Sequence, residues 1–393
     1  MRIGIDASCW ANARGYGRYA RELIRAMVRS YPDDEFVFFL DQRSLEVFHL
    51  DRPNVRTVLV EQSASPTRAA VTGSSRSPRD MLRFSRATRR EELDVFFSPS
   101  VYTYFPLPLR LPALVAIHDA IAERFPEKTL PTFKDRFFWR LKVGLALRQA
   151  TLILTVSDYA KGEIVRELDQ PSDRIRVAKE APASTFRPES DPNAVAEAAR
   201  QHGIPEGAAW FVYVGGFNPH KNLPRVVRAV ARLRREGDPG SAHLLLVGSR
   251  GREGFHGEVD LIDANIAEEG MGDRIHWAGY VPDEELRVLL SGAAGLLIVS
   301  ESECFGLTGV EAAECGCPVV ATTESPLPSL LEGGGWFVDP GDEEGLVAAM
   351  RHALSDPAEG RRRGAVALER VGVLSWPRSA EAVMAALHEV ARS

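Results

Sequence analysis

Cysteine is scarce in this sequence, with four residues in 393. That number is too low for a framework of disulfide bonds. Cys304, Cys315 and Cys317 lie close together, but a Cys-x-Cys pair without a second matched pair is weak spacing for zinc. We therefore interpret them as small buried residues and expect no metal site.

Long apolar runs and an excess of basic charge are also missing. No run approaches the ~18 residues that indicate a membrane span. The first residues, Met-Arg-Ile-Gly-Ile-Asp, directly predict a strand, so we expect no signal peptide and a cytoplasmic protein. The net charge of −6 gives no support to nucleic-acid binding by the whole chain.

The chain does contain a regular alternation of short apolar runs with helical stretches. This pattern predicts parallel sheets covered by helices on both faces, and the length fits two domains of about 190 residues each. The predicted fold class is α/β, with two doubly wound Rossmann-like domains facing a central cleft. The runs that predict strands are 2–6, 36–40, 55–60, 95–98, 113–117, 152–156, 210–214, 244–247, 275–277, 296–299 and 319–321.

The domain boundary is expected in residues 180–194, EAPASTFRPESDPNA, which hold three prolines and little apolar periodicity. We assign residues 1–185 to an N-terminal domain and 186–375 to a C-terminal domain. Residues 376–393 predict a helix with one apolar face. In a fold of this kind we expect that helix to return to the N-terminal domain.

Two further segments stand out by composition. Residues 61–80 are rich in Ser, Pro and Arg and lack aromatic residues, so we expect a mobile loop within the first domain. Residues 133–150, FKDRFFWRLKVGLALRQA, predict a basic, aromatic helix. Either a buried amphipathic helix of the first domain or contact with an anionic membrane fits this composition.

The stretch ESECFGLTGVEAAECGCPVVAT, residues 301–322, places Glu303 and Glu311 on either side of a glycine-bearing turn. The pattern is strand, loop, helix, strand, and the loop opens at the carboxyl end of a parallel strand, where open α/β sheets bind ligands. Amides at the helix N-terminus near residues 306–308 would favour an anion such as a pyrophosphate. Eight helical residues rise about 12 Å, the scale of a nucleotide-sugar. The alternative is a pair of solvated surface glutamates.

A second candidate is YVGGFNPHKNLPRVV, which begins at Tyr213. Here Gly215 and Gly216 end a strand, and Lys221 stands before a helix. Glycines let a phosphate approach the backbone, and a lysine supplies a point charge for it. The alternative is an exposed lysine at a helix start. This is not a Walker loop, because no Gly-Lys-Ser/Thr follows.

Two more candidates lie in the first half. Gly15 and Gly17 precede a helix after the first strand and fit a flexible loop over a crevice better than a dinucleotide fingerprint, with a plain connection as the alternative. His118 directly follows an apolar run, so it is expected at the ligand-binding end of the sheet. A satisfied core or surface histidine is the alternative.

Together these segments resemble the retaining GT-B glycosyltransferases of family 4, over nearly the whole chain. ECFGLTGVE followed by CGCPVVAT is similar to the family's E-G-F-G-L-P-x-x-E and G-x-P-V-V-A. VGGFNPHKNL resembles its phosphate-binding lysine segment, and IHD resembles its first-domain histidine segment.

The resemblance implies a role for each candidate. Glu311 would hold the ribose hydroxyls, Glu303 would contact the donor sugar, and Lys221 would neutralise the leaving pyrophosphate. His118 would contact the transferred sugar, which makes His118, Glu303 and Lys221 the implied catalytic set. The implied donor-binding set is Gly15, Gly17, Gly215, Gly216, Lys221, Arg250, Phe305, Gly306, Leu307, Thr308 and Glu311.

The implied enzyme is a retaining, metal-independent hexosyltransferase of polysaccharide or glycoconjugate biosynthesis. It would move a mannose- or glucose-type sugar from GDP-mannose or UDP-glucose to a glycan, lipid-linked or small-molecule acceptor bound on the N-terminal domain. The nucleotide-sugar is then a co-substrate, and no cofactor is implied. The absence of an Asp-x-Asp motif agrees with metal independence. Peripheral contact with the inner face of the membrane is left open.

The chain departs from the family pattern at a few positions. Many members carry an arginine where this chain has Gly216 and Phe217, so one phosphate charge must come from elsewhere, with Arg250 and Arg252 as candidates. Ser329 stands where the family has a glutamate, and Thr308 replaces a frequent proline.

Two other functions fit a two-domain α/β protein. A non-hydrolysing nucleotide-sugar epimerase needs no acceptor, and a two-lobed sugar-binding protein performs no chemistry. Incubation with a nucleotide-sugar alone discriminates them. An epimerase converts it, a transferase only hydrolyses it slowly, and a binding protein leaves it unchanged.

Overall fold

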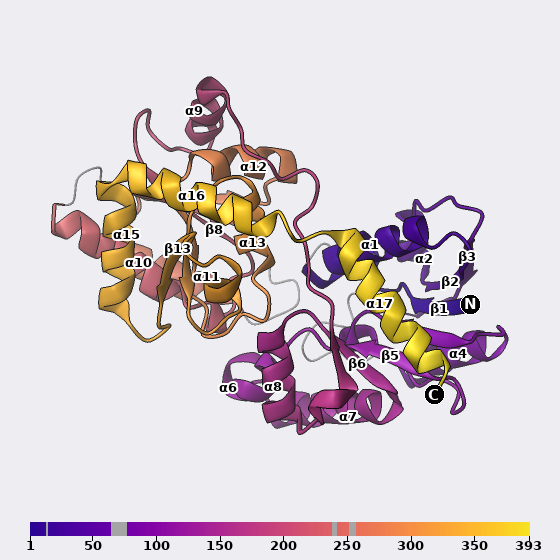
Figure 1. The fold of residues 1–393 in the computed structure, drawn as a ribbon. Coiled ribbons are helices and arrows are strands. Elements are labelled where there is room, and N and C mark those ends of the chain that lie inside the picture. The colour runs from indigo at the N-terminus through magenta and orange to yellow at the C-terminus, as the bar shows by residue number, and fades with distance from the viewer. Residues whose placement is uncertain (13–14, 64–76, 238–241, 251–256) are drawn as a thin grey trace. The chain divides into compact units, whose positions relative to one another are not determined.

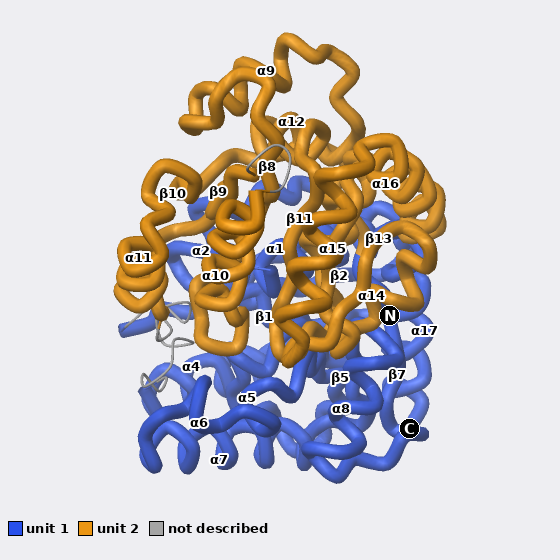
Figure 2. The backbone as a smooth tube through the Cα atoms, turned by 90° about the vertical axis from the view of Figure 1, so that its left-hand side faces the viewer, with its two compact units in different colours: residues 1–180, 253–255, 375–393 blue, residues 181–252, 256–374 orange. Residues whose placement is uncertain are grey.

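The computed structural model describes residues 1–12, 15–63, 77–237, 242–250 and 257–393. Contacts divide the chain into two compact units, shown in different colours in Figure 2. Unit 1 comprises Met1–Glu180 and Ser375–Ser393, and unit 2 comprises Ala181–Arg252 and His256–Leu374.

Unit 1 is built on a seven-stranded parallel sheet in the order β3-β2-β1-β4-β5-β6-β7. Its strands are buried apolar runs, the pattern of a sheet covered on both faces. They are β1 (Arg2–Asp6), β2 (Glu35–Leu40), β3 (Val55–Leu59), β4 (Val95–Ser98), β5 (Ala113–Ala116), β6 (Leu152–Thr155) and β7 (Ile175–Val177). The helices are α1 (Gly15–Ser30), α2 (Gln42–Glu46), α4 (Pro78–Arg89), α5 (Ile121–Arg124), α6 (Pro126–Thr129), α7 (Phe133–Gln149) and α8 (Asp158–Leu168), with short 3₁₀ turns at Val101–Thr103 and Ser172–Arg174.

Unit 2 is built on a six-stranded parallel sheet in the order β10-β9-β8-β11-β12-β13. The strands are β8 (Trp210–Val214), β9 (His243–Val247), β10 (Ile275–Gly279), β11 (Gly295–Ile298), β12 (Val319–Thr322) and β13 (Gly335–Val338). The helices are α9 (Pro192–Gln201), α10 (Leu223–Arg235), α11 (Val259–Glu268), α12 (Asp283–Gly292), α13 (Leu307–Glu314), α14 (Leu327–Leu330), α15 (Glu343–Ser355) and α16 (Pro357–Val371), with a 3₁₀ turn at Pro219–Lys221. The predicted α/β fold with two Rossmann-like domains is confirmed.

The last helix, α17 (Trp376–Ala391), returns to unit 1, where it packs against α1 and against strands β4 to β7 (Figure 1). Its apolar face is buried there and includes Val383, Leu387 and Val390. Its N-cap is Ser375, whose side chain accepts from the Arg378 amide. The start of α17 is therefore set by the Ser375 N-cap, and its apolar face is buried by packing against unit 1.

Several details differ from the sequence-based expectations. The proposed linker 180–194 ends in helix, because Pro192 begins α9 after the N-cap Asp191. The short strands β7 and β13 were not predicted, since three or four residues give too little pattern. Most of the loop expected at 61–80 lies outside the described residues, and its last three residues are helical instead, because α4 begins at Pro78.

Candidate active site

Each sheet has one point where the strand order reverses, and ligands of open α/β sheets bind beside such points. In unit 2 the reversal lies between β8 and β11, which pair as parallel neighbours. The chain leaving β8 leads to Lys221, and the chain leaving β11 leads to Glu303. Two segments that are 82 residues apart in sequence are thus brought to one edge of the sheet.

Lys221 and Glu303 form an ion pair through Nζ and Oε1, the central contact of this site. Ser300 Oγ donates to the same carboxylate oxygen at 2.7 Å. Burial alone would raise the pKa of Glu303, but the Lys221 ammonium, with the Ser300 hydroxyl, holds that pKa below its usual value. The site therefore keeps the Glu303 carboxylate ionised beside Lys221 in a mostly buried setting.

Backbone hydrogen bonds fix the two loops to each other and to the next strand. The Glu301 amide donates to the His220 carbonyl at 2.8 Å, and the Glu303 amide donates to the Glu324 carbonyl at 2.9 Å. Asn222, at φ 61° in the left-handed region, donates from its side-chain amide to the carbonyls of Val299 and Pro340 at 3.4 and 3.2 Å. These hydrogen bonds hold the backbone of both loops, and so they fix the positions from which the side chains of Lys221 and Glu303 extend.

Helix α13 begins directly after this pair. Gly306 is its N-cap at φ 80°, and a side chain there would approach Leu327 Cδ1 to 2.8 Å. Only glycine fits both conditions without strain. The amides of Leu307 and Thr308 lie in the first turn, where a helix favours an anion. Glu311 follows one turn later and is 3% exposed.

The glycine segment after β8 is held by the neighbouring strand β9 and by Tyr213 of β8. The Gly215 amide donates to the Val247 carbonyl at 3.0 Å, and the Tyr213 hydroxyl donates to the Gly216 carbonyl. Burial, with the nearby Glu303 charge, raises the pKa of Tyr213, so its phenol stays protonated and remains a donor. Phe305 is buried beside Gly306.

The candidate phosphate-binding arginines of unit 2 differ in whether their guanidinium groups already have partners. Arg250 pairs with Asp263 and lies over the Trp277 ring, with its guanidinium carbon 4.4 Å from the ring centroid. Its charge is therefore already partly neutralised. Arg225, in the first turn of α10, has buried Nε and Nη1 atoms with no hydrogen-bond partner in the described part of the chain. Arg252 lies outside the described residues.

His118 belongs to unit 1, two residues beyond β5. Its Nε2 lies 2.8 Å from the Pro99 carbonyl, and its Nδ1 lies 3.9 Å from the Glu180 carboxylate. The Tyr19 ring meets the imidazole edge to face at 4.5 Å. Burial lowers the pKa of His118, but the Glu180 carboxylate outweighs it and the net pKa is raised. Glu180 gave no signal in the sequence.

The two glycines of unit 1 do not form the predicted loop before a helix, because helix α1 already begins at Gly15 and includes Gly17. Gly17 lies in the first turn of α1, and a Cβ atom there would come within 2.1 Å of the Asn12 carbonyl oxygen. Gly15 begins the same helix and is exposed. At the strand-order reversal of this sheet, between β1 and β4, Thr103 Oγ1 donates to the buried Asp6 carboxylate at 2.7 Å.

The predicted residues thus form two separate groups. Lys221 and Glu303 come together in unit 2, just before the start of α13, and Glu311 lies within that helix. In unit 1, His118 lies just beyond β5, whereas Gly15 and Gly17 lie in the first turn of α1. Sequence reasoning missed Ser300 and Asn222, although an asparagine directly before a helix is a recognisable signal for a left-handed residue.

The model of the family described as glycosyl transferases group 1 matches residues 195–368, and that of the glycosyl transferase 4-like domain matches residues 14–179. The chain is 32% identical over 285 residues to O-antigen chain mannosyltransferase B of Escherichia coli, covering 72% of this chain and 71% of that protein. It is 36% identical over 177 residues to an MMP alpha-(1->4)-mannosyltransferase of Mycolicibacterium hassiacum, covering 44% of this chain and 41% of that protein.

Solved structures share the fold at low identity. Sucrose-phosphate synthase from Thermosynechococcus elongatus superposes with a TM-score of 0.77 at 22% identity, over 99% of this chain and 98% of that chain. The Anabaena protein HepE in complex with UDP-glucose superposes with a TM-score of 0.74 at 17% identity, over 99% of this chain and 100% of that chain.

Proposed function

Because the chain belongs to the glycosyl transferases group 1 and is a glycosyltransferase with the GT-B fold, we propose that it is a retaining hexosyltransferase. In this proposal it uses a nucleotide-sugar with a mannose-type sugar, and a glucose-type sugar is the second choice. The names of two mannosyltransferases to which the chain is similar support mannose. The UDP-glucose complex of HepE supports a nucleotide-sugar donor. The acceptor is a glycan, a lipid-linked sugar or a small molecule.

The observation that carries this proposal is the Lys221–Glu303 pair beside the α13 N-terminus. A nucleotide-sugar presents a diphosphate next to a sugar. The Lys221 ammonium and the first amides of α13 suit the diphosphate, and the Glu303 carboxylate suits the sugar.

The proposed reaction breaks the bond between the anomeric carbon and the diphosphate oxygen. Negative charge grows on the leaving diphosphate, where Lys221 and the helix amides stabilise it. The acceptor hydroxyl attacks on the same face of the sugar, and its proton passes to the leaving phosphate oxygen. These groups supply the charge that the step requires, so we propose that it needs no divalent metal.

Arg225 is the candidate for the further phosphate charge. Among the described residues, its buried Nε and Nη1 atoms have no hydrogen-bond partner, whereas the Arg250 guanidinium is paired with Asp263. Arg225→Gln is therefore expected to weaken nucleoside diphosphate binding more than Arg250→Gln. Calorimetric titration of both variants with the same diphosphate compares them directly.

Ligand binding and product stereochemistry test the proposal. Nucleoside diphosphates and nucleotide-sugars should raise the melting temperature, because a ligand at 100 times its dissociation constant adds about 2.7 kcal/mol. Proton NMR of the product should show the anomeric configuration of the donor, with equal rates in the presence of EDTA. An inverted product, or loss of activity with EDTA, would contradict the retaining, metal-independent mechanism.

A further inference from the structure

Helix α7 of unit 1 exposes large apolar side chains along four turns. Phe133, Phe137, Leu141 and Leu145 follow one another at four-residue spacing, which puts them on one side of the helix. Their exposed fractions are 85%, 54%, 48% and 40%, and Phe138 beside them is 43% exposed. The stripe is about 18 Å long at 1.5 Å per residue.

The opposite side of α7 is also apolar. Val143, Ala146 and Leu147 are buried against the core of unit 1. The expectation of a first-domain helix that buries one side holds, but an amphipathic helix does not account for the apolar outer side. Such a helix puts polar residues on its outer face, whereas α7 places phenylalanine and leucine there, where they need a second apolar environment.

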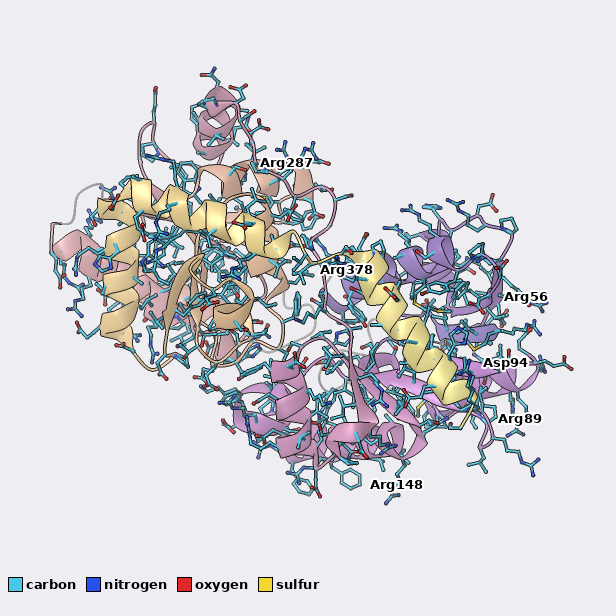
Figure 3. The ribbon with its side chains drawn as sticks, in the orientation of Figure 1. Arg56, Arg89, Asp94, Arg148, Arg287 and Arg378 are labelled. Atoms are coloured by element: carbon cyan, nitrogen blue, oxygen red, sulfur yellow. The ribbon has the colours of Figure 1, made fainter. Side chains whose placement is uncertain are left out.

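Basic side chains flank the stripe. Lys134, Arg140 and Arg148 are exposed and form no ion pair with any other residue that the structure describes. Arg148 lies at the periphery of unit 1 (Figure 3). The acidic residue of the helix, Asp135, accepts from Thr132 Oγ1 at 2.6 Å in the N-cap. The charge around the stripe is therefore positive.

The surface continues beyond α7. Residues 104–111 lie between α7 and α4, since Gln149 accepts from Tyr104 and Leu107 while Ser85 donates to the Pro106 carbonyl. This segment exposes Leu109 fully, and α4 exposes Leu82 at 52%. We call α4, residues 104–111 and α7 together the α4–α7 surface. It holds ten Lys and Arg but only two acidic residues, in a chain whose net charge is −6.

We propose that the α4–α7 surface binds the surface of an anionic lipid bilayer. Phenylalanine and leucine would enter the interface between headgroups and acyl chains, and the lysine and arginine side chains would reach the anionic headgroups. A second copy of the chain is the less favourable partner, because a two-fold contact would place two positively charged surfaces against each other. The proposal does not depend on the transfer reaction. The described helices include none with the length and apolar character to cross a membrane.

Vesicle partitioning of the full chain tests the proposal. It should bind vesicles of phosphatidylglycerol and phosphatidylcholine, and bind pure phosphatidylcholine vesicles much more weakly. The triple variant Lys134→Gln, Arg140→Gln, Arg148→Gln should partition about a hundredfold more weakly, since each basic group near an anionic surface contributes about fivefold. The double variant Phe137→Ser, Leu141→Ser should lose about tenfold or more.

Matched controls separate location from charge and composition. Arg29, Arg43 and Arg52 are exposed residues of unit 1 outside this surface, and their triple change to Gln alters the net charge equally. Val47→Ser with Leu261→Ser removes two apolar side chains of similar exposure, both 46%. Both controls should bind vesicles within about threefold of the parent chain, and all variants should keep its melting temperature.

Three results would overturn the proposal. The first is equal partitioning of the α7 triple variant and its arginine control. The second is equal binding to anionic and neutral vesicles. The third is a dimer in analytical ultracentrifugation that Phe137→Ser, Leu141→Ser converts to monomer without any change in vesicle binding, since the apolar stripe would then be a contact between copies.

Discussion

Lys221 and Glu303 form one ion pair. A substitution of either residue therefore changes both the net charge of the site and its ability to bind a diphosphate. The ammonium holds the pKa of the carboxyl down against burial. Without Lys221, burial would dominate, and an uncompensated carboxylate would destabilise unit 2. Effects on ligand binding and on stability therefore have to be separated by experiment.

The first prediction concerns Lys221→Ala. It should weaken a nucleoside diphosphate by about ten- to a hundredfold, because a hydrogen bond to a charged group is worth about 1.5–3 kcal/mol. The unphosphorylated nucleoside should bind nearly as before. Calorimetric titration measures both, and equal weakening of the two ligands would remove the phosphate role.

A double variant distinguishes the phosphate role from a folding defect. Lys221→Ala with Glu303→Gln removes both charges of the pair. It should recover the melting temperature that Lys221→Ala loses, since no uncompensated carboxylate remains. Its diphosphate affinity should stay low, and recovery of both properties would show that Lys221 acts only through Glu303.

The second prediction separates the two glutamates. Glu311→Ala should raise KM by about ten- to a hundredfold with a small change in kcat, because ribose contacts are equal in the ground and transition states. Glu303→Gln should lower kcat strongly with a smaller change in diphosphate affinity, because positive charge develops on the sugar as the bond breaks. Steady-state kinetics on both variants decides it. An unchanged kcat for Glu303→Gln would reverse the assignment.

At the scale of elements, strands β9 and β10 carry a histidine pair at the edge of the unit 2 sheet. His243 Nδ1 lies 2.8 Å from His276 Nε2, and Arg274 lies 3.1 Å from the other ring nitrogen of His243. Burial, followed by the charges of His276 and Arg274, lowers the pKa of His243 to about 4. Burial also lowers the pKa of His276. The folded chain therefore holds this pair uncharged at neutral pH.

The third prediction is a loss of stability in acid. The unfolded chain takes up protons at these histidines near their ordinary pKa of 6.5, whereas folded His243 takes one up only near pH 4. The free energy of unfolding should therefore fall as the pH is lowered through this window. His276→Gln should reduce this slope, and His49→Gln, at an exposed position, should not. Urea titrations between pH 4 and 7 measure it, and identical slopes for both variants would contradict the prediction.

At the scale of the whole molecule, unit 1 is built from two separate parts of the described chain, with its last helix contributed by residues 375–393. Unit 2 is one continuous stretch of the described chain, whereas unit 1 needs α17 from the C-terminus. Leu387 in α17 is fully buried, and Leu346 in α15 is 1% exposed in the core of unit 2. The two leucines offer matched substitutions in the two units.

The fourth prediction uses that match. Leu387→Ala and Leu346→Ala should each cost about 2–5 kcal/mol, the usual effect of a cavity in a core. Leu387→Ala should lower hydrogen-exchange protection in α1 and in strands β4 to β7, and Leu346→Ala should lower it in strands β8 to β13. Exchange measured by mass spectrometry on the full chain shows the pattern. Loss of protection in unit 2 from Leu387→Ala would contradict the assignment of α17 to unit 1.

The sequence alone determined the class of the fold and most of the candidate residues, but not Ser300, Asn222, Glu180 or Arg225. Apolar runs such as 2–6, 210–214 and 319–321 have the length and burial of parallel strands, so local pattern suffices to locate them. Glycines before helices marked the turns, and Gly306 has the positive φ that only glycine adopts readily.

Only the tertiary structure decided which residues meet. Lys221 pairs with Glu303 because β8 and β11 are neighbours at the point where the strand order reverses, and no local pattern contains that order. His118 lies near Glu180 because the strands that precede them, β5 and β7, belong to the same sheet, an arrangement no local pattern contains. The exposed side of α7 could not be predicted either, since a helix that is apolar on both sides gives no periodic signal for which side the core will cover.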